Sequence, residues 1–256
     1  MPDGKSYDRN DFIKTFNNIA RHRHRYEVFR DFVTMSAISL HNAVNMNEAM
    51  EQEYLQIVGQ YKKEEASDFC KLLEPEPRDI LGGLYMELEL GNNNTGQFFT
   101  PPEISLMMAQ ISYGDQLQNM ERPYITLSEP ACGAGGIVLA FVSVMLSHKL
   151  NPAEKLWVQC IDVDRLAALM CYLQLSLWHV PAEIIIGNTL TMEFRQTLYT
   201  PAHYLHGWDA RLHYRQVKEL IMQAPTKMPE ADKPELPIEK PKQAPKGDNL
   251  QFDFSF

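Results

Sequence analysis

A cluster of glycines near the middle of the chain has the composition of a ligand-binding turn. Residues 129 to 136 read EPACGAGG, after the apolar run Tyr124 to Leu127 and before the apolar run Ile137 to Phe141. This order predicts a strand, a glycine turn and a helix. At Gly133 and Gly135 a ligand could approach the main chain, and the free N–H groups of the helix favour a carboxylate or phosphate. Tight strand-to-helix turns also need glycine for steric reasons alone, so both interpretations stay open.

Two polar residues follow the next two apolar runs. Asp162 follows residues 156 to 161, and an acidic residue there can accept both ribose hydroxyls of a nucleoside ligand. The alternative is that Asp162 caps the next helix, a role that Asp164 fills better. Asn188 carries a donor and an acceptor that could read an adenine edge, and a turn-forming asparagine is its alternative role.

Strands and helices alternate around these residues. The pattern predicts strand 124–128, helix 136–148, strand 156–161, helix 164–178 and strand 183–186. Such alternation is typical of a βαβαβ unit, an α/β fold with a parallel sheet and right-handed crossovers. The glycine turn, Asp162 and Asn188 would then lie at the ends of consecutive strands.

The part of the chain before this unit has a helical pattern. Residues 9 to about 92 carry apolar residues at helical spacing and no convincing strand, which predicts a helical N-terminal domain. A loop at residues 91–96, GNNNTG, leads into a helix start. We expect Thr100 to be its N-cap, with prolines in the first turn and Glu103 completing a capping box.

Composition limits the classes of function. The 256 residues, 45% of them hydrophobic, suffice for one sizeable core, and no apolar run is long enough to span a bilayer. The polar first residues lack a secretory signal, so we expect a cytoplasmic protein without a membrane role. A net charge of −9 argues against broad DNA affinity, so any nucleic-acid contact should be local. The four cysteines form no CxxC pair and predict reduced thiols rather than a metal site or disulfides: Cys70, Cys132, Cys160 and Cys171.

Four elements in sequence order, GQFFTPP, EPACGAGG, IDVDRLAALM and GNTL, resemble the adenine-N6 DNA methyltransferases of the modification-subunit type. The resemblance covers residues 78 to 195. The GQFFTP element before a (D/E)PxCGxGG element is characteristic of that family, whereas the glycine element alone suits any class I methyltransferase. The resemblance implies a class I, Rossmann-like sheet, S-adenosylmethionine as cofactor and DNA as substrate.

The same resemblance implies a cofactor pocket with two walls. One wall packs over the methionine end of the cofactor, and the glycine turn forms the other. Asp162 would hold the ribose. Asn188 stands where the family usually has an acidic residue near the adenine amino group, which should weaken the purine contact without abolishing it. The residues assigned to the first wall are Gly96, Phe98, Phe99, Thr100 and Pro101, and those assigned to the second are Glu129, Ala131, Gly133 and Gly135.

The chain departs from the family at the catalytic loop. The family methylates a flipped-out adenine with an (N/D)PP(Y/F) loop, whose amide and proline carbonyl bind the amino group. No such tetrapeptide occurs in the sequence. The nearest stretch, Tyr199 to Tyr204, lacks the amide, and a proline turn between packed elements is its favoured interpretation. The alternatives to a DNA adenine-N6 methyltransferase are a non-catalytic accessory or decoy subunit of a restriction-modification or mobile-element system, and another adenosine-ligand enzyme.

The sheet should also be shorter than in the family, where it has seven strands. Few residues separate Leu190 from the Pro/Lys/Glu tail, and residues 191 to 222 look more helical than strand-like. The first strand would then keep an open edge of unpaired N–H and C=O groups, which native proteins cover. We expect residues 191 to 222, a partner chain or a second copy of the chain to cover this edge.

The C-terminal segment differs from the rest in composition. Residues 224 to 249 interleave prolines with Lys and Glu, which predicts a flexible linker. The final QFDFSF, Gln251 to Phe256, would place three phenylalanines on one side of a strand. It resembles the peptides with which bacterial replication and repair proteins dock on the sliding clamp; folding back on the chain itself is the alternative. The expected domains are 1–92 (helical), 93–222 (methyltransferase-like) and 223–256 (disordered tail).

Overall fold

The computed structural model describes residues 9–61, 79–88, 90, 99–118, 120 and 122–223. The chain divides into two compact units, Met1–Tyr214 and Arg215–Phe256. The sheet and the site described below belong to the first unit. The domain boundaries expected at residues 92 and 222 stay predictions.

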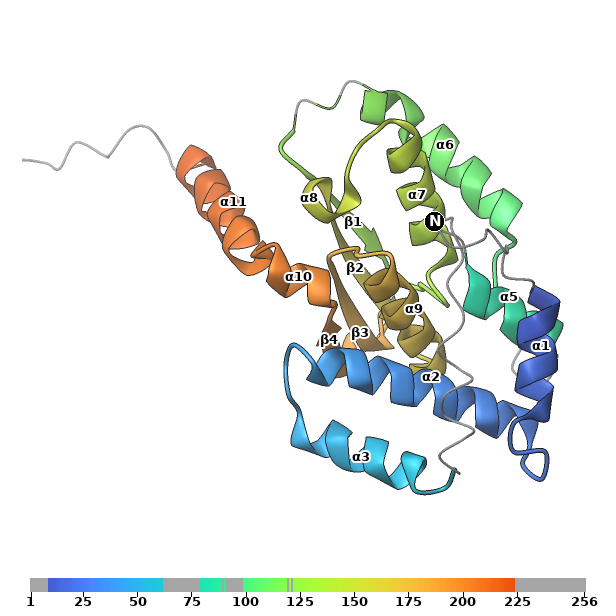
Figure 1. Cartoon of the computed structure of the whole chain (residues 1–256). Helices are drawn as coiled ribbons and strands as arrows, with labels where there is room; N and C mark the ends of the chain where they lie inside the picture. The colour runs from blue at the N-terminus through green and yellow to red at the C-terminus, as the bar shows by residue number, and fades with distance from the viewer. Residues whose placement is uncertain are drawn as a thin grey trace, which may run out of the picture. The chain divides into compact units, whose positions relative to one another are not determined.

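The first unit contains a four-stranded sheet with the order β1-β2-β3-β4 (Figure 1). The first three strands are parallel, in a register that pairs Leu127 with Val158 and Cys160 with Ile184. This confirms the predicted α/β fold and its βαβαβ unit. The strands are β1 (Ile125–Glu129), β2 (Leu156–Asp162), β3 (Ala182–Asn188) and β4 (Glu193–Tyr199).

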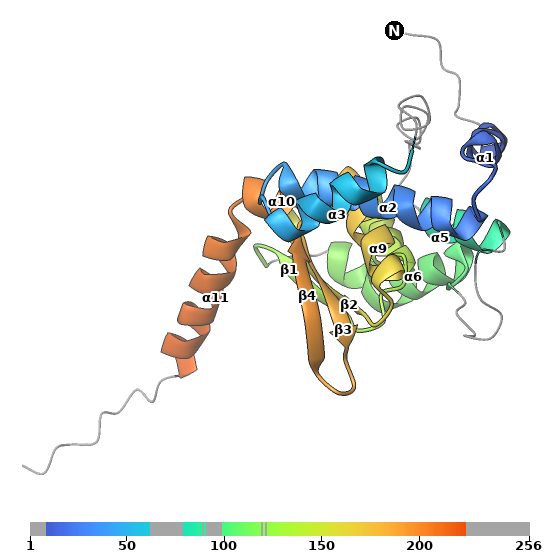
Figure 2. The ribbon, with the colours of Figure 1, turned by 90° about the horizontal axis from the view of Figure 1, so that it is seen from below.

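Helices cover one face of this sheet. The crossover from β1 to β2 contains α7 (Gly136–Ser147) and α8 (Pro152–Lys155), and the crossover from β2 to β3 is α9 (Arg165–Leu177). Inward side chains such as Val158 and Ile184 are fully buried in the core. Figure 1 shows α7 and α9 on the same side of the strands, and Figure 2 shows α9 beside the strands from below.

The opposite face of the sheet carries polar side chains that bond from strand to strand. Gln159 Nε2 donates to Glu183 Oε2 at 2.9 Å, and the Tyr199 hydroxyl donates to Glu183 Oε1 at 2.7 Å. The Ser128 hydroxyl extends this row to β1, at 3.4 Å from Gln159 Oε1. Because these side chains bond to one another, their polar groups are satisfied without a helix packed on this face of the sheet.

Residues 191 to 222, expected to be more helical than strand-like, contain two helices after residue 200, but residues 193–199 form a strand that the sequence did not predict. β4 runs antiparallel to β3, with a register shift at Ile186/Gly187. Only Leu198 of β4 is buried, so the alternating apolar signal of a strand is almost absent from its sequence. Polar composition of this kind is typical of an edge strand. Gly187 is needed there, because an added Cβ would lie 2.5 Å from the carbonyl oxygen of Glu193.

The segments before the sheet are helical, as predicted, in the part that the structure describes. α2 packs on α9 and α3, and α6 packs on α7, so that one hydrophobic core joins the early helices to the sheet. The Tyr172 ring of α9 contacts the His41 ring of α2, with 6.3 Å between centroids. The helices are α1 (Arg9–Asn18), α2 (Arg25–Asn42), α3 (Glu48–Val58), α5 (Ile80–Glu87) and α6 (Pro102–Gln118). None of the described helices is long and apolar enough to cross a membrane.

The start of α6 differs from the expected capping box. The amides of Ile104 and Ser105 donate to the carbonyl oxygen of Pro101, at 3.1 and 3.0 Å. Pro101 therefore occupies the cap position that we expected for Thr100. Pro102 opens the helix, where a missing N–H leaves no bond unmade.

Residues 193 to 199 do not cover the outer edge of β1, because they pair with β3 at the far side of the sheet. The chain then forms α10 (Pro201–Leu205) and α11 (Trp208–Gln223). Trp208 is buried, and its Nε1 donates to the carbonyl of Ala153 in α8 at 3.1 Å. Within the described residues, no strand pairs with the second edge of β1.

Candidate cofactor site

The glycine turn after β1 is held by main-chain bonds to the next strand. The amide of Cys132 donates to the carbonyl of Ile161 at 2.9 Å, and the amide of Gly135 donates back to the carbonyl of Cys132 at 2.9 Å. Gly133 and Gly135 have φ angles of 54° and 94°, in the region that disfavours side chains. Gly135 is the N-cap of α7, so the turn ends at the N-terminus of a twelve-residue helix, an anion-binding position.

The two motifs that sequence analysis assigned to one pocket meet at Phe99. A Cβ added to Gly133 would lie 3.0 Å from Cδ1 of the Phe99 ring, so this ring contacts the turn at a position where only glycine fits. The Tyr85 ring packs against the Phe99 ring, with 5.6 Å between the ring centroids. Thr100 and Pro101 follow at exposed positions. Gly96 and Phe98 lie outside the described residues.

Asp162 lies at the carboxyl end of β2 and bonds directly to the turn. Its Oδ2 accepts from the amide of Gly133 at 2.8 Å, and its Oδ1 accepts from the amide of Asp164 at 2.8 Å. Burial raises the pKa of this carboxyl above its usual range, although these two amide bonds oppose the shift. A carboxylate has about four acceptor sites, so Asp162 can still accept from an outside donor. Asp164 caps α9 instead, through the amides of Leu166 and Ala167, as expected.

Asn188 stands at the carboxyl end of β3, but its side-chain oxygen already forms the next turn. Oδ1 accepts from the amides of Leu190 and Thr191 at 2.9 and 3.3 Å. This is the turn-forming role that the sequence left open, and it removes the acceptor needed to read an adenine amino group. The neighbouring Thr189 hydroxyl donates to the carbonyl of Pro130 at 2.7 Å and joins the ends of β1 and β3.

Glu129 and Ala131 flank the same turn. The Glu129 carboxylate accepts from the amide of Ala131 at 3.2 Å, and its burial raises the pKa of this group. Glu129 is half-buried and Ala131 is exposed. Of the predicted site residues that the structure describes, those of the turn, Asp162 and Asn188 thus gather at the carboxyl ends of three parallel strands.

A buried polar group that the sequence did not reveal, Gln174, bonds to the main chain of the turn. Gln174, buried in α9, donates to the carbonyl of Ala134 at 2.7 Å and to Asp79 Oδ1 at 2.9 Å. Its own oxygen accepts from the amide of Ile80 at 2.8 Å. Burial raises the pKa of Asp79. Gln174 interrupts the apolar run of α9, and this was the first available signal; Asp79 as an N-cap before residue 80 was the second.

The stretch nearest to a catalytic loop lies at the other end of the sheet. Thr200 follows β4, and its hydroxyl accepts from the amide of Ala182, the first residue of β3. Tyr199 to Tyr204 are therefore one strand length, roughly 20 Å, from Asp162 and Asn188. This placement agrees with a proline turn between packed elements.

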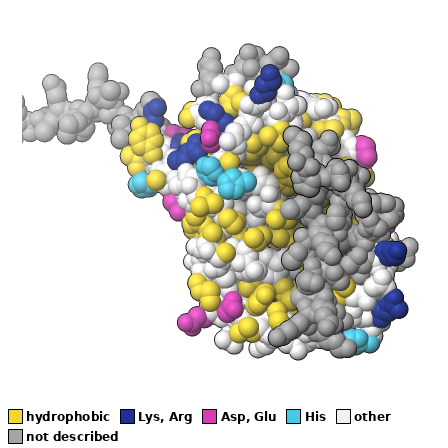
Figure 3. All heavy atoms as spheres, in the orientation of Figure 1, with side chains coloured by type: hydrophobic (Ala, Val, Ile, Leu, Met, Phe, Trp, Pro, Cys, Tyr) yellow, Lys and Arg dark blue, Asp and Glu magenta, His cyan; other side chains and the backbone are white. Residues whose placement is uncertain are grey.

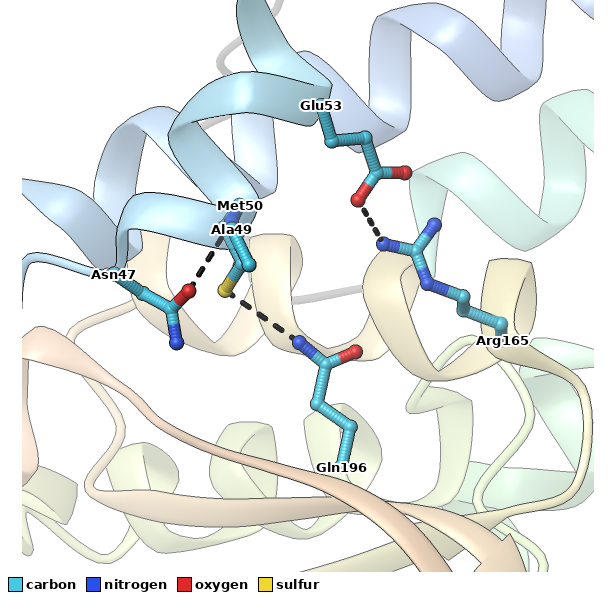
Figure 4. Close-up of a pocket in the computed structure, with 6 residues that line it drawn as sticks. All are labelled: Asn47, Ala49, Met50, Glu53, Arg165 and Gln196. Carbon is cyan, nitrogen blue, oxygen red and sulfur yellow. Dashed lines mark hydrogen bonds and ion pairs between the residues drawn. The ribbon is translucent and has the colours of Figure 1, made fainter.

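An open pocket of about 530 Å³ lies beside α3, α9 and β4 (Figure 4). In it Arg165 Nη2 pairs with Glu53 Oε2 at 2.8 Å, and Gln196 Nε2 lies 3.4 Å from the sulfur of Met50. It includes none of the predicted cofactor residues. The predicted site lies outside this pocket, at the glycine turn.

A sheet with a glycine turn, an acidic residue and a helix N-terminus at its carboxyl ends belongs to the nucleotide-binding α/β class. Residues 77–210 match the family model of N-6 DNA methylases, which is more than half of the 256-residue chain. The chain belongs to the N-6 DNA methylase family. Its sheet is a shortened form of the class I methyltransferase fold, and family membership implies S-adenosylmethionine as the cofactor.

Comparison with other proteins adds little beyond the family. No curated protein matches the chain. One solved structure, assigned to the class I S-adenosylmethionine-dependent methyltransferases of Listeria monocytogenes, matches at 15% identity with a TM-score of 0.39. The match covers 68% of this chain and 51% of that one, so the chain spans about half the length of that structure.

Proposed function

We propose that the carboxyl end of the sheet binds S-adenosylmethionine in a protein that serves adenine-N6 methylation of DNA. The observation that supports this best is the junction at Gly133, whose amide bonds to Asp162 and whose Cα faces the Phe99 ring. Three separate motifs meet there. A backbone cradle, an acceptor and an aromatic wall suit the three parts of that cofactor.

The residues present fit this ligand. Gly133 and Gly135, both at positive φ angles, carry no side chain, so a ligand can approach the main chain of the turn. The free lone pairs of Asp162 can accept the ribose hydroxyls, and the N-terminus of α7 favours the methionine carboxylate. When bound, the cofactor supplies an electrophilic methyl group; the chain's own residues hold and orient it. Asn188, with its oxygen engaged in a turn, would offer the purine only N–H donors.

The substrate of the proposed reaction is the N6 amino group of adenine in DNA. On the face shown in Figure 3, hydrophobic side chains predominate over Lys and Arg, and the net charge is −9. This balance favours DNA contact through a partner subunit over broad contact by this chain. The missing (N/D)PP(Y/F) sequence favours the alternative, a non-catalytic accessory or decoy subunit of a restriction-modification or mobile-element system in the cytoplasm.

A second polypeptide is proposed to cover the free edge of β1. In doubly wound sheets the ligand binds beside the first strand, where the strand order reverses. In the described residues no strand lies beyond β1, so that side of the proposed ligand site has no strand of its own. α6, next to α7, exposes an apolar stripe at helical spacing, up to 78% for Ile111. The stripe consists of Ile104, Met107, Met108 and Ile111. Light scattering of wild type and Ile111→Asp tests this: a wild-type monomer with full cofactor affinity would contradict it.

The proposed clamp contact concerns Gln251 to Phe256, which lie outside the described residues. A peptide of residues 247 to 256 titrated against a bacterial sliding clamp should bind, and Gln251→Ala should abolish binding. No binding at high micromolar concentration would leave only docking within the chain.

Calorimetric titration with S-adenosylmethionine tests cofactor binding. Asp162→Asn leaves one of two main-chain amides without its acceptor and weakens ribose binding, so we expect a loss of about 1 to 3 kcal/mol. Asp164→Asn is the matched control, because asparagine caps a helix equally well and affinity should not change. Equal affinities for both variants would remove Asp162 from the pocket. A methyl-transfer assay on mixed genomic DNA then separates an enzyme from an accessory subunit.

A further inference from the structure

Three cysteines converge beneath the glycine turn. Cys132 comes from the turn, Cys160 from β2 and Cys171 from α9, and their sulfur atoms all lie within 4.8 Å of one another. All three are free and buried. Sequence spacing could not reveal this group, because the members are far apart in the chain and form no CxxC pair.

We propose that Cys132, Cys160 and Cys171 bind a single Cu(I) ion. Thiolates are the soft ligands that Cu(I) prefers, and three sulfurs at this separation can surround one ion with little movement. Structural zinc requires four ligands, and the group contains no fourth ligand atom among the described residues. The nearby Asp162 carboxylate is engaged with the amides of Gly133 and Asp164 instead.

Formation of the proposed site releases protons. Each thiol that becomes a Cu–S ligand loses its proton to solvent, at most three in all.

The position of the group gives the ion a structural consequence. A Cβ added to Gly135, the N-cap of α7, would lie 3.0 Å from Sγ of Cys171, so the sulfur packs directly under the helix N-terminus. An ion bound to all three sulfurs would fasten the turn to β2 and α9 and stabilise the conformation of Gly133 and Gly135.

An anaerobic titration of the full purified chain with Cu(I), in competition with a chromophoric Cu(I) chelator, tests the proposal. We expect one ion retained per chain. Cys160→Ser and Cys171→Ser should weaken retention more than about 100-fold, since loss of a supporting residue alone costs 10- to 100-fold. Cys70→Ser is the control and should retain the ion, because Cys70 is the remaining cysteine of the sequence.

A second measurement keeps the proposal testable if a serine variant fails to fold, as judged by circular dichroism. In the wild-type chain, Cu(I) should protect Cys132, Cys160 and Cys171 from alkylation after brief denaturant exposure, and should leave Cys70 reactive. Absence of retained ion in the wild type would show that the thiols only pack as small apolar groups. Tighter retention of Zn(II) than of Cu(I), or unchanged retention without Cys160, would also overturn the proposal.

Discussion

Polar and aromatic side chains lie at both ends of the parallel sheet, but they make different contacts at the two ends. At the amino end, Thr200, His203 and Trp208 are buried and bond to other parts of the chain. At the carboxyl end, Asp162 and Asn188 are only half-buried and lie beside a turn made of glycine. Hydrogen-bond partners, rather than residue types, therefore distinguish the packed junction at the amino end from the proposed ligand site at the carboxyl end.

The amino end is closed by a chain of specific contacts. The Trp157 indole N–H donates to Nδ1 of His203 at 3.1 Å, and Nε2 of the same ring lies 3.0 Å from Asp209 Oδ1. Thr200 Oγ1 donates to the carbonyl of Val180 at 2.7 Å and accepts from the amide of Ala182. The Trp157 indole N–H and the Thr200 hydroxyl hydrogen are thus bonded within the chain and are not available to a substrate.

Substitution of Trp208 should give the largest effect, on stability. Its ring is fully buried, lies 4.9 Å from the Tyr124 ring and is covered by the Arg211 guanidinium at 3.8 Å. Trp208→Ala should lower the free energy of unfolding by about 3 to 5 kcal/mol, because a large cavity forms and the Ala153 carbonyl loses its donor. Urea denaturation measures this.

Leu205→Ala is the matched control from the same segment. Leu205 is 69% exposed, so its removal should change the free energy of unfolding by less than about 0.5 kcal/mol. If both variants lose equal stability, the amino end is not the packed junction described here.

Glycine substitutions compare the two ends directly. Gly135 at the carboxyl end and Gly207 at the amino end both have positive φ, 94° and 60°. A Cβ at Gly207 meets no atom within 4 Å, whereas one at Gly135 meets Cys171 Sγ at 3.0 Å. Gly207→Ala should cost about 1 kcal/mol, and Gly135→Ala about 2 to 4 kcal/mol, because crowding adds to backbone strain. Urea denaturation of both variants gives the difference, and equal losses would contradict the packing under the turn.

The sequence predicted the carboxyl end better than the amino end, for a physical reason. Glycines, a strand-end Asp162 and long apolar runs are local signals, and they correctly placed β1, β2, β3 and the glycine turn. β4 was missed because only one of its side chains is buried and its pairing with β3 is a tertiary contact. The buried bridge of Gln174 to Asp79 joins residues 95 positions apart, a separation at which no local pattern operates.

The bridge under the turn should make stability depend on pH in an unusual direction. Burial raises the pKa of Asp79 above its ordinary value of 3.8, so the folded state favours the protonated carboxyl. Its stabilising contribution is complete below pH 3.8 and is lost as the pH rises through the folded pKa. Asp79→Asn, neutral at every pH, should therefore gain stability relative to wild type as pH rises. Urea denaturation across the acid range would show the reverse trend if the carboxylate were the favoured form.

The smallest expected effect concerns Tyr199, which tests whether the amino end takes part in chemistry. Tyr199→Phe removes only the bond to Glu183 Oε1, so the free energy of unfolding should fall by about 0.5 to 1.5 kcal/mol. Because the site lies at the other end of the strands, affinity for S-adenosylmethionine and any rate of methyl transfer should stay unchanged. Tyr204→Phe is the control for a lost surface bond, because it removes the hydroxyl that accepts from Asn45 Nδ2 at 3.0 Å. A catalytic loop would behave otherwise: removal of a group that stabilises the transition state typically lowers the rate about 100-fold or more. A loss of rate of that size in Tyr199→Phe, with unchanged cofactor affinity, would show that the amino end of the sheet, rather than the carboxyl end alone, takes part in the reaction.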